Sequence, residues 1–336
     1  MLAAPDKFKG TFSAAEVAAA MARGARAAGW DAVERPIADG GEGTAEALMA
    51  AHGGRWVEAD AHDALGRPVR ARFALLADAC DVVVGGERIA LPGGERTAVV
   101  EVAAASGLWR LTAEERDAFG ASSRGTGELI AAAVAAGAET VIVAAGGSAT
   151  TDAGQGAIDV VRGLDRLPHF VVACDTAVPF EHAPSVYGPQ KGARPAEVAA
   201  LEARLDGFAA AAPRDPRGLP MSGAAGGLAG GLWAWCGAEL VGGAALLLDA
   251  LALDVELARA DMVLTGEGCI DAQTLTGKGV GELAGRCVGA GIPCAAIVGR
   301  AALTRKQRDE LGLVAIAEAT SLDAIAAAAA ELLTHA

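Results

Sequence analysis

Short aliphatic runs alternate with longer, alanine-rich stretches along most of the chain. A short apolar run bounded by glycine or proline indicates a buried strand, and a longer run with helical spacing indicates a helix. Strands are expected at residues 1–6, 31–39, 140–147, 169–175, 260–268, 292–300 and 314–319. Helices are expected at residues 13–29, 41–54, 125–138, 153–164, 195–212, 274–291, 304–312 and 321–335. Strands that alternate with helices of this length predict an α/β fold with mostly parallel sheets wrapped by helices.

The alternation changes character near residue 55. Residues 55–76 and 96–103 are rich in β-forming residues, and turns are expected at Leu65–Gly66 and around Gly93–Gly94. Extended segments separated by such short turns predict antiparallel strands.

The central part of the chain is therefore expected to form a second domain. A loop rich in glycine and proline is expected at 212–231, and helical sequence follows as far as Arg259. Strand–helix units at both ends of the chain can share one sheet, which makes the central segment an insertion. The expected division is a discontinuous α/β domain of residues 1–58 and 260–336, and an inserted α/β domain of residues 59–259.

Composition restricts the classes of protein that fit. Of the 336 residues, 52% are hydrophobic and only 4% are aromatic, so the core must be aliphatic. The net charge of −14 argues against non-specific binding to nucleic acid or to an anionic membrane. The N-terminal sequence MLAAPDKFKG lacks the pattern of a signal peptide, and charges interrupt the long apolar runs. We therefore expect a cytoplasmic protein, without nucleic acid or membrane as its partner.

Five segments share one design, in which a strand ends in glycine, a carboxylate or small polar residues. They are AAPDKFKG (3–10), PIADGGEGT (36–44), VAAGGSATTD (143–152), VACD (172–175) and VLTGEGCID (263–271). Open parallel sheets bind ligands beyond the carboxyl ends of their strands, so these segments are expected to converge on one cleft or on two facing rims. A single segment of this kind is often only a turn, whereas five in one chain indicate a binding site.

The segment VAAGGSATTD has the residue types of a phosphate site. Gly146 and Gly147 allow backbone N–H groups to approach phosphate oxygens, and Ser148, Thr150 and Thr151 add hydroxyl donors. Several carboxylates in one cleft repel one another unless a cation bridges them, and Mg²⁺ with a nucleotide is the usual bridge. Phosphoryl transfer then needs positioning, cations and at most one base. The candidate cations are lysines beside glycine, each of which could also be a surface charge: Lys9, Lys191 and Lys278.

Other enzyme classes fit the sequence less well. The nearest approach to a G-x-x-x-x-G-K-[ST] motif has Ala272 in place of the first glycine and Gly279 in place of Ser or Thr. No G-x-G-x-x-G follows a strand, and Ser148 lacks the second glycine of a G-x-S-x-G elbow. The six cysteines have no metal-binding spacing, and the five histidines lie in no recognisable catalytic context. A metal-assisted transferase fits best.

Seven motifs in order resemble those of the bacterial glycerate kinase family. They are APDKFKGT, ADGGEGT, GTGELI, GGSATTD, YGPQKGA, GAAGGLAGG and GEGCIDAQTLTGK, and they span residues 4–278. The resemblance therefore covers nearly the whole chain. It implies ATP-dependent phosphorylation of D-glycerate, which gives 2-phosphoglycerate in most of the family. It also implies two α/β domains, one flavodoxin-like and one with a restriction-enzyme-like sheet, which face each other across a cleft.

On this basis we assign expected roles. Nucleotide phosphates are expected at Gly146, Gly147, Ser148, Thr150, Lys191 and Lys278. Mg²⁺ is expected at Asp175, Glu267 and Asp271. Glycerate is expected at Asp6, Gly41 and Glu42. The expected catalytic residues are Asp175, Lys9 and Asp39. The cofactors are thus ATP and Mg²⁺, and the oligomeric state is open, a homodimer included.

The chain departs from the resembled family at a few positions. Thr151 and Val178 each replace an asparagine, and Cys269 replaces an arginine. The stretch between Asp152 and Asp175 is also shorter. These departures leave two alternatives beside a glycerate kinase: a kinase for a related small hydroxy acid, and a ligand-binding relative without catalysis.

Overall fold

The structure is a computed structural model that describes residues 1–8, 10–84, 86–272, 274–276 and 279–334. Its contacts divide the chain into two compact units. Unit 1 comprises Met1–Asp39 and Leu247–Ala336, and unit 2 comprises Gly40–Leu246. Both boundaries precede the ones expected from the sequence, which followed residues 58 and 259. The first lies earlier because α2 (Thr44–His52) and β3 (Gly54–His62) pack on strands of unit 2.

Unit 1 is built on a parallel sheet of five strands in the order β2-β1-β11-β12-β13. The strands are β1 (Leu2–Ala3), β2 (Val33–Glu34), β11 (Val263–Thr265), β12 (Cys294–Val298) and β13 (Ala315–Glu318). In chain order this is 2-1-3-4-5, the flavodoxin-like arrangement. The parallel α/β sheet that the alternating sequence pattern predicts is thus confirmed.

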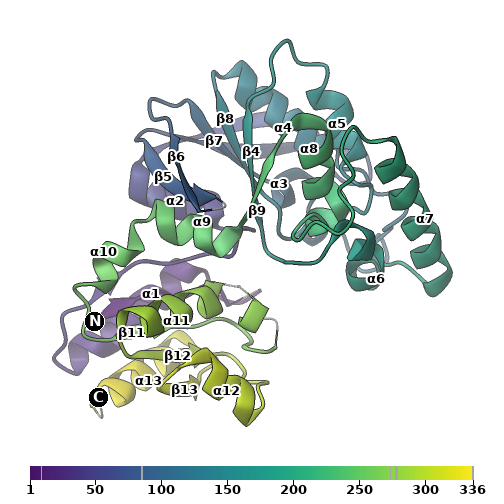
Figure 1. The fold of residues 1–336 in the computed structure, drawn as a ribbon. Coiled ribbons are helices and arrows are strands. Elements are labelled where there is room, and N and C mark those ends of the chain that lie inside the picture. The colour runs from purple at the N-terminus through teal and green to yellow at the C-terminus, as the bar shows by residue number, and fades with distance from the viewer. Residues whose placement is uncertain (9, 85, 273, 277–278, 335–336) are drawn as a thin grey trace. The chain divides into compact units, whose positions relative to one another are not determined.

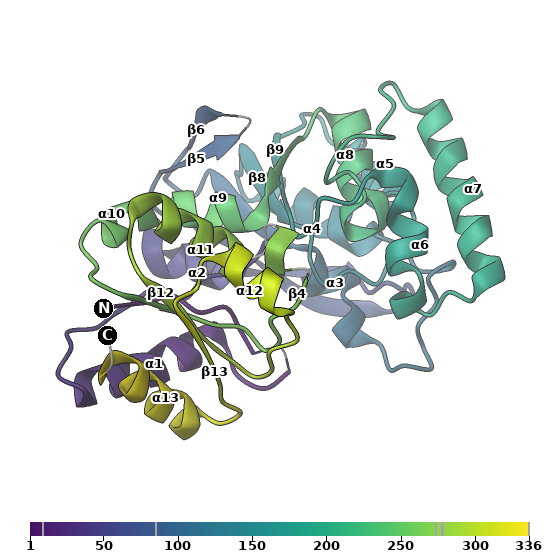
Figure 2. The same cartoon turned by 60° about the horizontal axis from the view of Figure 1, so that its bottom comes forward.

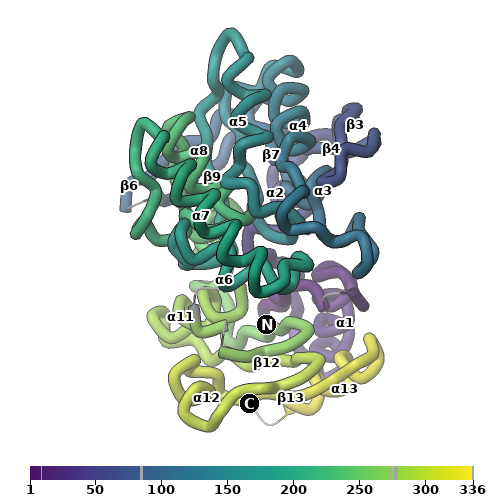
Figure 3. The backbone as a smooth tube through the Cα atoms, turned by 90° about the vertical axis from the view of Figure 1, so that its right-hand side faces the viewer, coloured from purple at the N-terminus to yellow at the C-terminus, as the bar shows by residue number. Residues whose placement is uncertain are grey.

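Helices cover both faces of this sheet. They are α1 (Ala14–Ala27), α10 (Leu253–Leu257), α11 (Gly279–Ala290), α12 (Arg305–Leu311) and α13 (Leu322–Thr334). Ala295 and Ile297 of β12 belong to the apolar cluster with α1 and α13, whereas Ala296 and Val298 belong to the cluster with α11 and α12. Successive strand residues point to opposite faces, so all of β12 is buried. Figure 3 shows β12 and β13 with α12 and α13 beside them.

Local sequence explains how α1 begins and packs. The Ser13 hydroxyl accepts the N–H of Glu16, and the Glu16 carboxylate accepts the N–H of Ser13, so the two residues form a capping box. Helices α1 and α13 lie side by side, as Figure 2 shows. Gly24 permits this approach, because a Cβ there would lie 2.0 Å from the carbonyl oxygen of Ala326.

Unit 2 contains a six-stranded mixed sheet in the order β10-β9-β8-β7-β4-β3. The strands after β3 are β4 (Pro68–Leu76), β7 (Thr97–Glu101), β8 (Thr140–Ala144), β9 (His169–Cys174) and β10 (Glu239–Gly242). Strands β7 to β10 are parallel, and β3, β4 and β7 pair in antiparallel fashion (Figure 1). The antiparallel interruption predicted from the sequence is confirmed, with Asp63 accepting the N–H groups of Leu65 and Arg67 at its turn.

Helices also surround the parallel part of this sheet. They are α3 (Val102–Ser106), α4 (Arg124–Ala135), α5 (Gln155–Val161), α6 (Ala183–Tyr187), α7 (Pro195–Ala211) and α8 (Leu228–Cys236), with α9 (Gly243–Ala250) crossing the unit boundary. The core is aliphatic, as the composition predicts, and the six cysteines are free thiols. Among the described residues, no helix combines the length and hydropathy that a membrane crossing requires.

For unit 2, one hairpin was not predicted and two expectations were wrong. A separate hairpin of β5 (Cys80–Val84) and β6 (Glu87–Leu91) was missed. Strand β10 lies within the region expected to be helical up to Arg259, because a short edge strand is defined by its pairing with β9 rather than by a long apolar pattern. The expected loop 212–231 includes the start of α8, whose glycines conceal the helical signal. These glycines serve packing, since a Cβ on Gly231 would lie 2.1 Å from the Ala153 carbonyl oxygen.

Candidate active site

The loop that follows β8 is held in place by close backbone contacts. The N–H of Gly146 donates to the Gly40 carbonyl at 3.1 Å, and a Cβ on Gly146 would lie 2.7 Å from the Gly41 Cα atom. Gly147 has a φ of 77°, a conformation that favours glycine. A Cβ on Gly147 would lie 3.5 Å from Glu42 Oε1. The structure thus brings together the expected residues Gly41, Glu42, Gly146 and Gly147.

A buried lysine lies against the polar residues of this loop. Lys191 Nζ donates to the Thr150 carbonyl at 2.6 Å and to Ser148 Oγ at 3.4 Å. The Ser148 and Thr150 hydroxyls are 3.2 Å apart, and Ser148 Oγ also accepts the N–H of Thr150. Only 3% of Lys191 is exposed. Gly146, Gly147, Ser148, Thr150 and Lys191, all expected at the phosphates, therefore lie in one place in unit 2.

Burial and nearby acids have opposite effects on Lys191. Burial lowers the pKa of its ammonium group to about 8, while the negative charges of Asp175 and Asp152 partly offset that shift. The group therefore stays mainly protonated at neutral pH. Asp175 follows β9, the neighbour of β8, and its Oδ2 lies 3.3 Å from where a Cβ of Gly146 would be. Its charge also raises the pKa of Tyr187, though less than burial of that phenol does.

Asp152, the carboxylate of the same motif, has a structural role. Its Oδ2 accepts the N–H and the hydroxyl of Ser123, both at 2.8 Å, and its Oδ1 accepts the N–H of Gly154. Asp152 Oδ2 also accepts the N–H of Gly156 in the first turn of α5. The carboxylate thus fixes the starts of α4 and α5, where the helix dipole favours negative charge. Thr151 is buried, and its hydroxyl has no hydrogen-bond partner among the described residues.

The acids expected in unit 1 follow the strands at its topological switch point, between β1 and β11. The N–H of Asp6, after β1, donates to the Gly266 carbonyl, after β11. Asp6 is buried, which raises the pKa of its carboxyl to about 7, and the charges of Asp39 and Glu267 act in the same direction. The structure thus brings together Asp6, Asp39 and Glu267.

Glu267 and Asp271 belong to a single turn. The Thr274 hydroxyl donates to Glu267 Oε1 at 2.6 Å and accepts the N–H of Asp271 at 3.3 Å. Within the described ranges, no group of three or more His, Cys, Asp or Glu side chains is arranged to hold a metal ion. Lys9 and Lys278, expected to be catalytic and nucleotide-binding, lie outside the described residues.

Sequence reasoning missed Glu101, at the end of β7. Its Oε1 accepts the N–H groups of Gly43 and Ala45 at 3.0 Å each, and so caps the start of α2 beside Glu42. A carboxylate at the end of a predicted strand was the available signal. It went unnoticed because Glu101 is followed by valine and alanine, without the glycine that marks the other segments.

Fold and site define a two-unit α/β protein with a glycine-rich loop beside a buried lysine, and with an acidic switch point in its flavodoxin-like unit. Comparison with known proteins makes the assignment specific. The model of the glycerate kinase family matches residues 1–165 and 161–336. The chain belongs to the glycerate kinase family, as its motifs predict.

Individual relatives agree with this assignment. A glycerate kinase of Bacillus subtilis (strain 168) is 38% identical over 320 residues, which cover 83% of this chain and 79% of the relative. A glycerate 2-kinase of Escherichia coli (strain K12) is 37% identical over 314 residues, which cover 82% of this chain and 78% of the relative. A crystal structure provisionally named glycerate kinase 2, from Salmonella typhimurium LT2, superimposes with a TM-score of 0.77 at 33% identity and covers 99% of this chain and 97% of that chain.

Proposed function

We propose that the protein transfers the γ-phosphoryl group of ATP to a hydroxyl of D-glycerate, with 2-phosphoglycerate as the product. Family membership supports the reaction class. The observation that carries the proposal within the chain is Lys191, a buried cation that contacts the Ser148–Thr150 loop. Burying an ammonium group is costly unless hydrogen bonds and opposite charges compensate for the loss of water, and phosphate oxygens bound at this loop would provide both.

The residues of the loop fit nucleotide phosphates. Gly146 and Gly147 let the loop pack closely against Gly41, Glu42 and Ala103. A loop backbone without side chains is also the kind that can approach an oxyanion closely. The hydroxyls of Ser148 and Thr150 and the ammonium of Lys191 add donors at the same place. Lys278, which the sequence indicates as a candidate, would add a further cation.

Mg²⁺ fits the donor chemistry of the acids. It is commonly held by one or two carboxylates together with phosphate oxygens, so a complete protein cage is not required. The residues proposed to hold it are Asp175, Glu267 and Asp271. When bound, the ion neutralises charge on the reacting phosphates.

Glycerate is assigned to Asp6, Gly41 and Glu42, with Asp175, Asp39 and Lys9 as catalytic groups. A carboxyl with a pKa near 7, as Asp6 has, can accept a hydrogen bond or a proton from a hydroxyl at neutral pH. Cys269 replaces an arginine of the resembled family, but Arg300 Nη2 donates to its sulfur at 3.4 Å. A guanidinium therefore remains beside this turn.

The test is an ADP-coupled assay with D-glycerate, ATP and Mg²⁺, followed by NMR of the phosphorylated product. Activity that stops on chelation and returns with Mg²⁺ supports the metal assignment. Turnover only with another small hydroxy acid would make the chain a kinase for that acid instead of glycerate. Tight binding of nucleotide without any turnover would make the chain a ligand-binding relative.

A further inference from the structure

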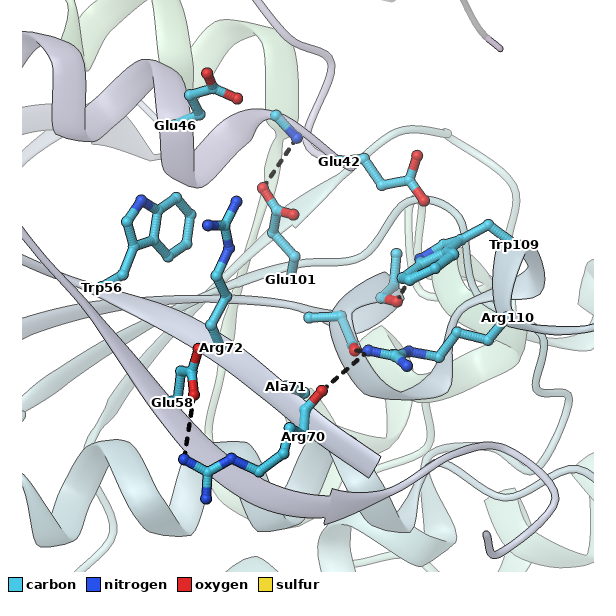
Figure 4. A pocket seen from close by; sticks show the side chains of 13 residues that line it. Glu42, Glu46, Trp56, Glu58, Arg70, Ala71, Arg72, Glu101, Trp109 and Arg110 are labelled. Carbon is cyan, nitrogen blue, oxygen red and sulfur yellow. Dashed lines mark hydrogen bonds and ion pairs between the residues drawn. The ribbon is translucent and has the colours of Figure 1, made fainter. Parts of the chain in front are cut away.

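Unit 2 contains a cavity of about 490 Å³ that the sequence analysis did not anticipate. Its walls come from the start of α2, from β3 and β4, and from the segment that joins β7 to the short 3₁₀ helix Leu108–Arg110. Two indole rings line it, Trp56 from β3 and Trp109 from the 3₁₀ helix (Figure 4). The volume falls within the range of small-molecule sites, about 300–1,000 Å³.

The cavity lies next to the glycine loop. The N–H of Leu108 donates to the Gly147 carbonyl at 2.9 Å, so the residue before Trp109 is bonded directly to the loop. Glu42 and Ala103 line the cavity, and both lie within 3.5 Å of where a Cβ of Gly147 would be. A ligand whose phosphates contact the loop can therefore extend into this cavity.

The charges of the lining nearly cancel, with four glutamates against three arginines. Glu58 pairs with Arg70, and Glu101 accepts backbone N–H groups of α2. The guanidinium groups of Arg72 and Arg110 lie over the indole rings of Trp56 and Trp109, at 3.9 and 4.6 Å from the ring centroids. A lining with polar edges, flat faces and almost no net charge suits a neutral heterocycle better than a free carboxylate or phosphate.

Trp109 is fixed in place yet largely open. Its indole N–H donates to the Ala103 carbonyl at 2.8 Å, and Arg110 donates to the Ala104 carbonyl through Nε at 2.9 Å. Even so, 62% of Trp109 is exposed. A large aromatic ring held in one orientation and left in contact with water is a surface ready for stacking.

We propose that this cavity binds the adenine nucleoside of the nucleotide, with the base stacked on Trp109 and the Glu46 carboxylate facing its polar groups. The inference rests on the proposed function for the identity of the ligand. It adds a base-recognition site to the phosphate loop, made by the antiparallel half of the unit 2 sheet.

Kinetics of Trp109→Ala test the proposal. Loss of a base–aromatic stack is expected to raise KM for ATP on the order of tenfold. KM for glycerate and kcat should remain at wild-type values, because the phosphate loop is intact. Trp233→Ala is the matched control, since Trp233 also carries a stacked arginine, Arg214, but lies in α8 outside the cavity lining. It should leave KM for ATP unchanged.

A second variant and a binding readout guard against misfolding. Ala104→Leu fills part of the cavity with a larger side chain and keeps the backbone carbonyl that Arg110 contacts. It should weaken binding of ADP but not of inorganic tripolyphosphate, which lacks a base. Titration with ADP should quench tryptophan fluorescence in the wild type, and Trp109→Phe should lose most of that quenching.

The outcomes separate this inference from the proposed function. Wild-type glycerate phosphorylation with unchanged KM for ATP in both Trp109→Ala and Ala104→Leu would overturn the base site alone. A rise in KM for glycerate instead of ATP would indicate that the cavity binds glycerate, and it would also overturn the inference of a base site. If the wild type does not phosphorylate glycerate, the proposed function fails, and ADP quenching through Trp109 still supports the cavity assignment or, by its absence, refutes it.

Discussion

The glycine loop of unit 2 and the switch point of unit 1 have the same kind of sequence, yet their electrostatics are opposite. In unit 2, Lys191 is the buried charge beside the loop, and burial lowers its pKa. In unit 1, Asp6 is the buried charge after the strand, and burial raises its pKa. Both groups have pKa values close to neutrality, from opposite starting points.

The comparison shows that a glycine-rich motif does not by itself reveal the role of the carboxylate it contains. Asp152 belongs to the most conspicuous glycine segment but accepts hydrogen bonds that fix two helix starts. Within the described part of the chain, the Asp6 carboxylate accepts the N–H of Lys7 through Oδ1 and lies near the acids Asp39 and Glu267. A carboxylate saturated by helix donors is a structural group, whereas one destabilised first by burial and then by neighbouring acids is available to a ligand or a proton.

The largest effect is expected for Lys191→Met. Methionine fills a similar volume but removes the cation, so kcat/KM for ATP should fall about a hundredfold, as when a donor to a transition-state oxyanion is lost. Lys306→Met, at a mostly exposed lysine paired with Glu310, is the control and should retain full activity. Steady-state kinetics and circular dichroism of both variants check this. Full activity in Lys191→Met would remove the lysine from the mechanism.

Asp175→Asn tests the carboxylate that supports Lys191. We expect turnover to fall at least about tenfold while folding stays intact. Because the Asp175 charge favours the protonated lysine, the variant should also lower the pKa of Lys191 further. The wild type should lose activity as pH rises through about 8, and the alkaline limb of the variant should lie at lower pH. A pH profile with an unmoved alkaline limb would contradict this coupling.

The features that could be predicted from the sequence are those that depend on residues close together in the chain. The capping box of α1 and the parallel strands were predictable because hydrophobic spacing and caps are local signals. The Lys191 contact with Thr150 crosses 41 positions, so the sequence could only mark a lysine beside a glycine as a candidate. Strand β10 and the Trp109 cavity were missed because an edge strand and a single aromatic residue have no periodicity. In a chain with so few aromatic residues, a tryptophan next to an arginine was the available signal.

Gly146→Ala tests whether the shape of the loop matters beyond its charge. A Cβ there would lie 2.7 Å from the Gly41 Cα atom, so the loop must shift and activity should fall roughly tenfold, with a lower Tm. Gly207→Ala is the control, because its Cβ would meet nothing within 4 Å and α7 should gain about 1 kcal/mol of helix propensity. Equal Tm and kcat in the two variants would show that the tight approach is not needed.

The smallest effect is expected in unit 1, where it is measured on stability, separately from the turnover that Asp6 and Asp39 are proposed to support. The folded pKa of Asp6 is about 7, above its ordinary value of 3.8, so between these pH values the folded state binds more protons and stability falls as pH rises. Asp6→Asn removes this penalty and keeps an acceptor for the N–H of Lys7. From pH 5 to pH 8 its stabilisation relative to the wild type should grow by about 2.5 kcal/mol. Tm values at the two pH values measure this growth. Asp39→Asn should lower the pKa of Asp6 and flatten the same pH dependence, whereas a constant difference between Asp6→Asn and the wild type would mean that Asp6 does not titrate in this range.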